Sequence, residues 1–181
     1  GGTLVLASDD GAVMADNQVV LQLESLIKMC LKSLRDGGKI IFAGNGGSFA
    51  DAQHLSAELI SRFLFDRAPL PSLALGTNNS AISAIGNDYG YDQVFSRELE
   101  AVAKPEDVFI PITTSGSSSN ILMAVEVAKR QDITTVGLTG NRGGKLQALC
   151  PCICIPSTDT ARIQECHIML GHILCGLVES S

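Results

Sequence analysis

Two polar loops follow apolar, strand-like runs in this sequence, and both could bind an anion. The first, Gly44 to Ser48 (GNGGS), follows the run Lys39 to Ala43 and opens into a helical segment. Glycines let backbone N–H groups approach an anion closely, and a helix N-terminus adds partial positive charge. A dinucleotide fingerprint would need a further glycine where Phe49 stands, so a nucleotide cofactor is disfavoured here. A tight turn without a ligand is the alternative interpretation.

The second loop, Thr113 to Asn120 (TTSGSSSN), is rich in hydroxyl groups and again precedes a helical segment. Hydroxyl and N–H groups at a helix N-terminus can donate many hydrogen bonds to a phosphate. The loop has no lysine, so it is not a P-loop, and it suits a phosphomonoester. We expect one Ser or Asn of the loop to cap the helix. Because the loop holds more such residues than one cap requires, it predicts a phosphate site.

A third candidate is the pair His54 and Glu58, four residues apart on the helical segment after the glycine loop. That spacing places both side chains on one face of a helix. On the last helical segment, geometry alone pairs His172 with Glu165, seven residues earlier, better than with Gln164, eight residues earlier. Imidazole, carboxylate and amide oxygen can all bind a zinc-like ion, although a histidine satisfied in an apolar core is the more frequent case.

Composition narrows the function classes. The 181 residues are 45% hydrophobic and 18% charged with a net charge of -6, which excludes a disordered chain. No basic stripe for nucleic acid, no apolar run of about 18 residues for a membrane span and no basic signal-peptide region are present. The six cysteines are expected to be buried free thiols rather than a zinc site, and His167 is interpreted as structural. We expect a soluble, cytoplasmic domain.

The elements that must position these residues alternate between strand-like and helical patterns. Strands are predicted over 39–43, 72–75, 108–112, 134–138 and 152–155. Helices are predicted over 14–34, 49–63, 79–85, 93–102, 121–129, 145–149 and 162–178. Continuous apolar strands joined by helices indicate a parallel sheet covered on both faces. Ligands of such folds bind at the carboxyl ends of the strands, where both polar loops lie.

A resemblance to a known family rests on five segments, Gly44–Phe63, Gly86–Tyr91, Thr113–Asn120, Gly137–Gly144 and Ile155–Cys175. Together they resemble the phosphoheptose isomerases of the sugar isomerase (SIS) family, over about residues 37–179. The resemblance implies an α/β three-layer sandwich with a five-stranded parallel sheet flanked by helices, SIS-type and flavodoxin-like. It implies a single SIS domain over 1–181, in which 1–13 is an atypical N-terminal stretch and 14–36 holds the N-terminal helix.

The function implied by the resemblance is an aldose–ketose isomerisation of sedoheptulose 7-phosphate to D-glycero-D-manno-heptose 7-phosphate, for lipopolysaccharide precursors. The family works as a homotetramer with active sites between subunits, and some members hold one zinc ion per subunit. The implied zinc ligands are His54, Glu58, Gln164 and His172. The implied substrate contacts are Asn45, Gly46, Gly47, Glu58, Asn87, Asp88, Thr113, Thr114, Ser115, Ser118 and Gln164. For the proton transfers through an enediolate, we expect Glu58 to act as the base and His172 as the acid.

The sequence departs from the family pattern at two positions near the predicted site. Ser61 stands where a glycine is common, and Ala161 stands where an acidic residue sometimes lies, which predicts altered recognition of sugar hydroxyls. A sister branch of SIS proteins associates with the bacterial replication initiator and lacks the Glu and the second His. Glu58 and His172 are both present here, which favours the enzyme. A sugar-phosphate sensor without turnover is the third possibility.

Overall fold

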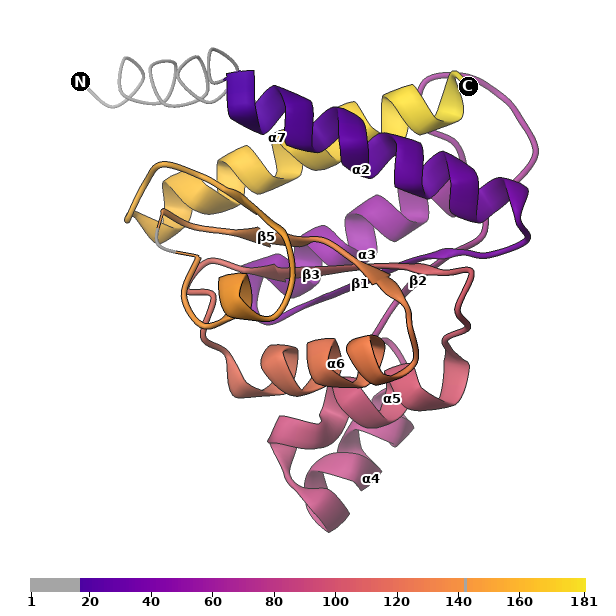
Figure 1. The fold of residues 1–181 in the computed structure, drawn as a ribbon. Coiled ribbons are helices and arrows are strands. Elements are labelled where there is room, and N and C mark those ends of the chain that lie inside the picture. Colours follow the sequence, from indigo (N-terminus) through magenta and orange to yellow (C-terminus); the bar gives the residue numbers. More distant parts are fainter. Residues whose placement is uncertain (1–16, 142) are drawn as a thin grey trace.

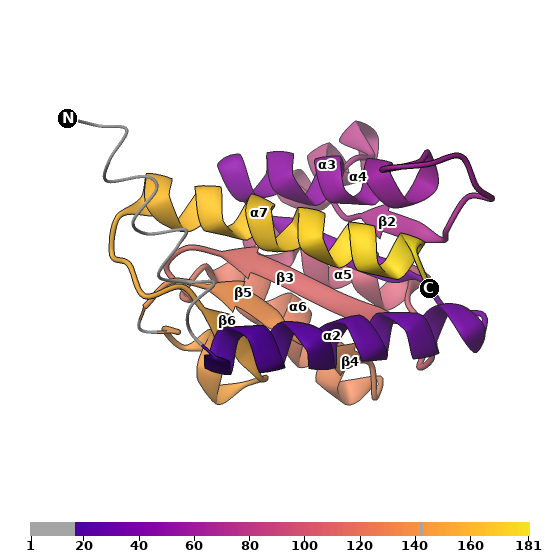
Figure 2. The same ribbon diagram turned by 90° about the horizontal axis from the view of Figure 1, so that it is seen from above.

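The computed structural model describes residues 17–141 and 143–181, so the predicted N-terminal stretch 1–13 lies outside the described residues. One parallel sheet lies between two layers of helices (Figures 1 and 2). In chain order, the elements are α2 (Asn17–Arg35), β1 (Ile40–Gly44), α3 (Gly47–Ile60), β2 (Ser72–Ala74), α4 (Asn79–Tyr89), η1 (Tyr91–Gln93), α5 (Val94–Val102), β3 (Val108–Thr113), α6 (Ser119–Arg130), β4 (Thr134–Thr135), β5 (Gly137–Thr139), η2 (Leu146–Ala148), β6 (Cys152–Cys154) and α7 (Thr160–Glu179).

The strand order is β2-β1-β3-β5-β6, with the short β4 also paired to β3, and every pair is parallel. β1 lies beside β3 along its whole length, from Ile40 opposite Val108 to Gly44 opposite Ile112. The two central strands therefore end at one level, and the two polar loops that follow them lie side by side. The predicted α/β class with a parallel sheet is confirmed.

The predicted strand 134–138 is divided into β4 and β5, although both parts keep one register on β3. Phe109 pairs with Thr135 and Ile112 pairs with Leu138. Between them, the Val136 N–H donates to the Phe109 carbonyl at 3.1 Å. The next bond of a parallel ladder would come from the N–H of residue 111, but Pro111 has none. The proline therefore interrupts the strand, and the sheet has six strands rather than the expected five.

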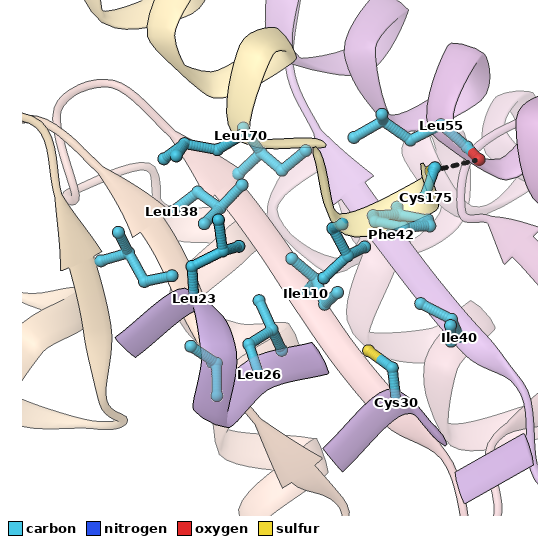
Figure 3. Packing of buried hydrophobic residues seen from close by; sticks show 14 of the residues in the cluster. Leu23, Leu26, Cys30, Ile40, Phe42, Leu55, Ile110, Leu138, Leu170 and Cys175 are labelled. Atoms are coloured by element: carbon cyan, nitrogen blue, oxygen red, sulfur yellow. Dashed lines mark hydrogen bonds between the residues drawn. The ribbon is translucent and has the colours of Figure 1, made fainter. Parts of the chain in front are cut away.

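Alternate strand residues face the two helical layers, because successive side chains of a strand point to opposite faces. Phe42 and Ile110 belong to the core with α2, α3 and α7 (Figure 3), whereas Ile41 and Phe109 belong to the core with α5 and α6. Both faces of the central strands are therefore buried, which explains their unbroken apolar runs. All six cysteines are free thiols, and five are buried as predicted, whereas Cys154 is partly exposed. None of the helices described here has the length and apolar character to span a membrane.

Two helices differ from their predicted bounds in ways that affect the site. α3 starts at Gly47 and ends at Ile60, not over 49–63. It ends early because the N–H groups of the segment Phe63 to Phe65 donate to the Glu179 carboxylate rather than to carbonyls of α3. α4 extends to Tyr89, has no buried residue, and packs beside α5 on the side away from the sheet (Figure 1).

His167 on α7 lies fully buried in the core. Its Nε2–H donates to the Thr139 carbonyl at 3.2 Å, which fixes α7 against the end of β5. Burial lowers the pKa of His167 to about 4, despite the opposing effect of that hydrogen bond. The unfolded chain therefore binds a proton between about pH 6.5 and pH 4 that the folded chain excludes.

Acid should therefore destabilise the protein through His167. The contribution of the neutral ring is complete above pH 6.5, and it is lost as the pH falls towards 4. We expect His167 to account for a loss of about 2 kcal/mol in the free energy of unfolding by pH 5. Urea unfolding of the parent and of His167→Asn at pH 7 and pH 5 measures this loss. Equal pH dependence in the two proteins would contradict it.

Candidate active site

A cavity lies at the carboxyl ends of β1 and β3, where the two polar loops meet α7. It is lined by Asn45, Ser48, Ile112, Thr113, Thr114, Ser118 and Gln164. The Gln164 amide packs directly on the glycine loop, since a Cβ on Gly47 would lie 2.5 Å from its Nε2. The structure thus brings the predicted glycine loop, hydroxyl loop and Gln164 together around one space.

Two helix N-termini open onto this cavity without side-chain caps. α3 follows Gly46, whose φ of 56° suits glycine, and α6 follows Ser118. Neither N-cap residue makes a side-chain capping hydrogen bond, so the predicted cap by a Ser or Asn of the hydroxyl loop is wrong at Ser118. The Ser118 hydroxyl instead lies 3.2 Å from the Thr113 hydroxyl. Two uncapped N-termini and a row of hydroxyls suit a phosphate group.

A reciprocal pair of amides joins the two loops. Asn45 donates to Oδ1 of Asn120 and accepts from Nδ2 of Asn120, both at 2.9 Å, and Asn120 is buried. The Tyr91 hydroxyl also donates to Oδ1 of Asn45 at 3.1 Å. Neither this contact of Asn120, expected at most to cap a helix, nor that of Tyr91 was predicted from the sequence. The only signal for Asn120 was its place at the end of the hydroxyl loop.

His54 and Glu58 of α3 form a cluster with His172 of α7. Nε2 of His54 lies 3.1 Å from Oε1 of Glu58 and 2.9 Å from Nε2 of His172. One ligand atom from each residue lies within 4.8 Å of the other two, so a single cation could bind all three. Neutral imidazole nitrogen and carboxylate oxygen are also the donors that zinc prefers. The predicted pair from α3 and the predicted histidine from α7 thus meet.

Asp51 is a further polar residue of this helix face that sequence reasoning missed. It lies one turn before His54 on α3, and its Oδ2 is buried without a hydrogen-bond partner among the residues described. Burial raises the pKa of Asp51 to about 6, although the nearby His54 acts in the opposite direction. Its signal was the three-residue spacing from His54, which places it on the same face.

Asn87 and Asp88 are not brought to the cavity of their own chain. They lie exposed on α4, joined by a hydrogen bond of 2.8 Å, and line a separate shallow groove. Thr114 and Ser115 also border a second, open polar cleft with Gly140 and Ser157. The predicted substrate contacts therefore fall into one main cavity, a neighbouring cleft, the cluster that contains Glu58 and a detached pair on α4.

Comparison with known proteins places this arrangement in a family. The SIS domain model matches residues 14–140. The chain belongs to the SIS domain family. Among SIS proteins, it is 52% identical over 171 residues to a phosphoheptose isomerase of Aneurinibacillus thermoaerophilus, which covers 94% of this chain and 86% of that protein.

Solved structures of SIS proteins agree with the fold. A phosphoheptose isomerase from Neisseria gonorrhoeae superposes with a TM-score of 0.86 at 37% identity, covering 98% of this chain and 93% of that one. A phosphoheptose isomerase from Francisella tularensis gives a TM-score of 0.85 at 33% identity, covering 98% and 99%. The similarity spans nearly the whole of each chain.

The uncapped helix N-terminus at Ser118 predicts an unusual mutational profile. Ser118→Ala should leave the free energy of unfolding nearly unchanged, because the hydroxyl caps no helix N–H. It should weaken the binding of inorganic phosphate at least about tenfold, through the loss of one charge-assisted hydrogen bond. Asn78→Ala is the matched control, because Asn78 caps α4 by accepting from the Ala81 N–H at 3.1 Å.

The control should show the opposite profile. Asn78→Ala should cost about 1 kcal/mol of stability and leave phosphate affinity at the parental value. Calorimetric titration and urea unfolding measure the two quantities. Parental phosphate affinity in Ser118→Ala would remove this hydroxyl from the anion site.

Proposed function

We propose that this SIS protein is a phosphoheptose isomerase that converts sedoheptulose 7-phosphate to D-glycero-D-manno-heptose 7-phosphate, in the synthesis of lipopolysaccharide precursors. The observation that carries the proposal is that one chain holds both a cluster of Glu58, His54 and His172 and a cavity with two uncapped helix N-termini. Relatives named phosphoheptose isomerase, about 50% identical over almost the whole chain, support the choice of substrate.

The phosphate is proposed to bind in the cavity between the two polar loops. Thr113, Ser115 and Ser118 would donate hydroxyl hydrogen bonds, and the first turns of α3 and α6 would donate N–H groups. Thr114, Asn45, Gly46, Gly47 and Gln164 complete the proposed set of substrate contacts. The asparagine pair between the loops supports this proposal, because it holds the two helix N-termini at a fixed separation.

The proposed chemistry transfers a proton between neighbouring carbons of the sugar. Glu58 takes the proton next to the carbonyl and returns it to the adjacent carbon, which passes the substrate through an enediolate. His172 moves a proton between the two oxygens, since an imidazole titrates closest to neutral pH. The contact of His54 with both residues supports these roles, because it orders the two side chains.

Replacing either proposed acid–base group should therefore abolish most turnover. Glu58→Gln and His172→Gln should each lower kcat by at least about 100-fold, because the amide of glutamine stays polar but cannot accept and return the proton. An assay of sedoheptulose 7-phosphate isomerisation, with circular dichroism to confirm folding, measures this. Parental turnover in either folded variant would show that the roles are assigned wrongly.

Zinc is the proposed cofactor, one ion per subunit. His54, Glu58 and His172 fit it by donor type and spacing, and Gln164 is the proposed fourth ligand. When bound, the ion would polarise the substrate carbonyl. An amide oxygen is a weak zinc ligand, so the ion should be removable.

Chelation therefore provides a test. Elemental analysis of the purified protein should find about one zinc per chain, and prolonged dialysis against a chelator should remove both zinc and activity. Re-addition of zinc should restore the activity. A protein without zinc that keeps full activity after chelation would exclude a catalytic metal.

A homotetramer with active sites between subunits is proposed for the assembly. α4 supports this, because it carries Asn87 and Asp88 and only Ile82 and Ile85 of its residues pack, partly buried, against the core of their own chain. An adjacent Tyr89 is also half exposed. A cytoplasmic location is proposed because six free thiols are typical of a reducing compartment.

Two other functions, a non-catalytic partner of the replication initiator and a sugar-phosphate sensor, are not favoured, because the similar proteins are named phosphoheptose isomerase. The sister branch lacks the Glu and second His, whereas Glu58 and His172 meet in this chain. The isomerisation assay distinguishes them, because only the enzyme converts the substrate.

A further inference from the structure

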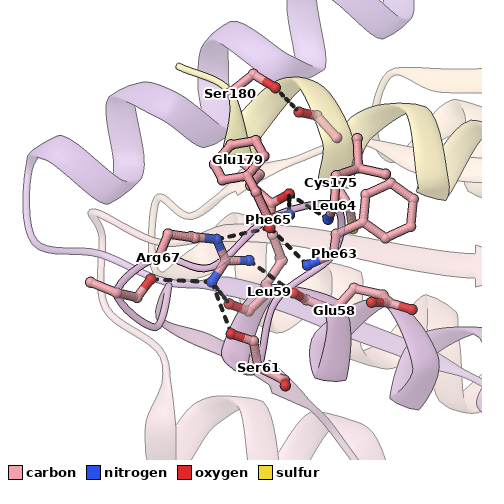
Figure 4. A network of polar contacts seen from close by, with 12 residues as sticks. Glu58, Leu59, Ser61, Phe63, Leu64, Phe65, Arg67, Cys175, Glu179 and Ser180 are labelled. Atoms are coloured by element: carbon pink, nitrogen blue, oxygen red, sulfur yellow. Dashed lines mark hydrogen bonds and ion pairs between the residues drawn. The ribbon is translucent and has the colours of Figure 1, made fainter.

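A buried ion pair joins the ends of the two helices that carry the proposed acid–base residues (Figure 4). Nε of Arg67 lies 3.0 Å from Oε2 of Glu179, the last residue of α7. The side chain of Glu179 is fully buried and that of Arg67 is 12% exposed. Neither residue lines the phosphate cavity or belongs to the cluster around His54.

Arg67 holds the last turn of α3, on which Glu58 lies. Its guanidinium donates to the Glu58 carbonyl at 2.9 Å and to the Leu59 carbonyl at 2.8 Å. The last carbonyls of a helix have no partner within the helix, and α3 has no basic residue in its last turn. Arg67 therefore supplies both the hydrogen bonds and the positive charge that stabilise this helix end. The backbone of Glu58 is fixed by the contact.

Glu179 holds the segment that follows α3. Its carboxylate accepts the N–H groups of Phe63, Leu64 and Phe65 at 2.7, 2.6 and 3.4 Å. Burial alone would raise the pKa of Glu179, but these N–H groups and Arg67 hold the pKa below its usual value, so the carboxylate stays charged. Phe63 in turn stacks on the ring of His172, with centroids 5.3 Å apart and planes at 20°.

We infer that Arg67 and Glu179 are positioning residues for the isomerisation, because one ion pair fixes both the backbone of Glu58 and the ring that stacks on His172. This inference rests on the proposed roles of Glu58 and His172. Proton transfer depends on placement to within a fraction of an ångström, so a loosened ion pair lowers turnover while the phosphate cavity is unchanged. Lysine cannot replace Arg67, since one ammonium group lacks the fork that spans the carbonyls of α3 and the carboxylate.

The kinetic test uses Arg67→Lys and Glu179→Gln. Each folded variant should lower kcat for sedoheptulose 7-phosphate by about 10- to 100-fold and keep KM within about twofold. The matched control is Asp107→Asn, which breaks a second buried ion pair, with Lys39 at 2.6 Å, at the amino ends of β1 and β3. This control should lose stability but keep the parental kcat, because the side chains of Lys39 and Asp107 bond to each other and to the backbone of Val102 and Lys104, not to α3 or α7.

A second measurement does not depend on activity. The chain has three histidines, so the ring signals of His172 can be assigned in a nuclear magnetic resonance spectrum of histidine-labelled protein. Arg67→Lys and Glu179→Gln should move the His172 signal, because the stacked Phe63 ring shifts with its segment, whereas Asp107→Asn should not. If the parent protein does not isomerise the sugar, the proposed function is wrong. The His172 signal then tests by itself whether the ion pair of Arg67 and Glu179 positions His172. Parental kcat in both folded variants, or an unmoved His172 signal in both, would overturn the inference.

Discussion

The register of β1 on β3 is the constraint on which the candidate site depends. Gly44 lies opposite Ile112, so both central strands end at the same level and both following helices begin there. Gly44 itself is required, because a Cβ at this position would overlap the backbone of Ser48 in the first turn of α3. A slip of one residue would reverse the buried faces of β1 and also separate the two helix N-termini. Asn45 and Asn120 then join loops that the sheet has already aligned.

The close approach of α3 and α7 provides the second half of the site. A Cβ on Gly171 would lie 2.5 Å from the Leu55 side chain, so the helices meet where α7 has no side chain. The Cys175 thiol also donates to the Leu55 carbonyl at 3.8 Å (Figure 3). His172 follows Gly171 directly, and His54 precedes Leu55. The absence of a side chain at Gly171 therefore allows the two histidines from different helices to come into contact.

The fold and the candidate residues could be predicted to different extents from the sequence. Alternating apolar strands and amphipathic helices determine the parallel sheet, because each strand must bury both faces. The i, i+4 spacing predicted the His54 and Glu58 pair, since local geometry alone fixes it. Spacing along α7 favoured Glu165 as the neighbour of His172. The contact of Gln164 with the glycine loop depends on how α7 crosses the sheet, which spacing within one helix does not encode.

Contacts between distant segments were the main features that local patterns did not reveal. Asn45 and Asn120 are separated by 75 positions, and nothing near either residue specifies the other. The early end of α3 depends on Glu179, a residue of the last helix.

By contrast, the break after β4 has a local cause, because Pro111 lacks the N–H that the ladder needs. The same proline has a dynamic consequence. β5 and β6 are each held by only a few backbone pairs on the far side of the interrupted ladder, so this edge can open as a unit of lower stability than β1 and β3. Amide exchange would then be graded across the sheet, with the most protected amides directly beneath the anion cavity and the least protected on the cysteine-bearing edge strand.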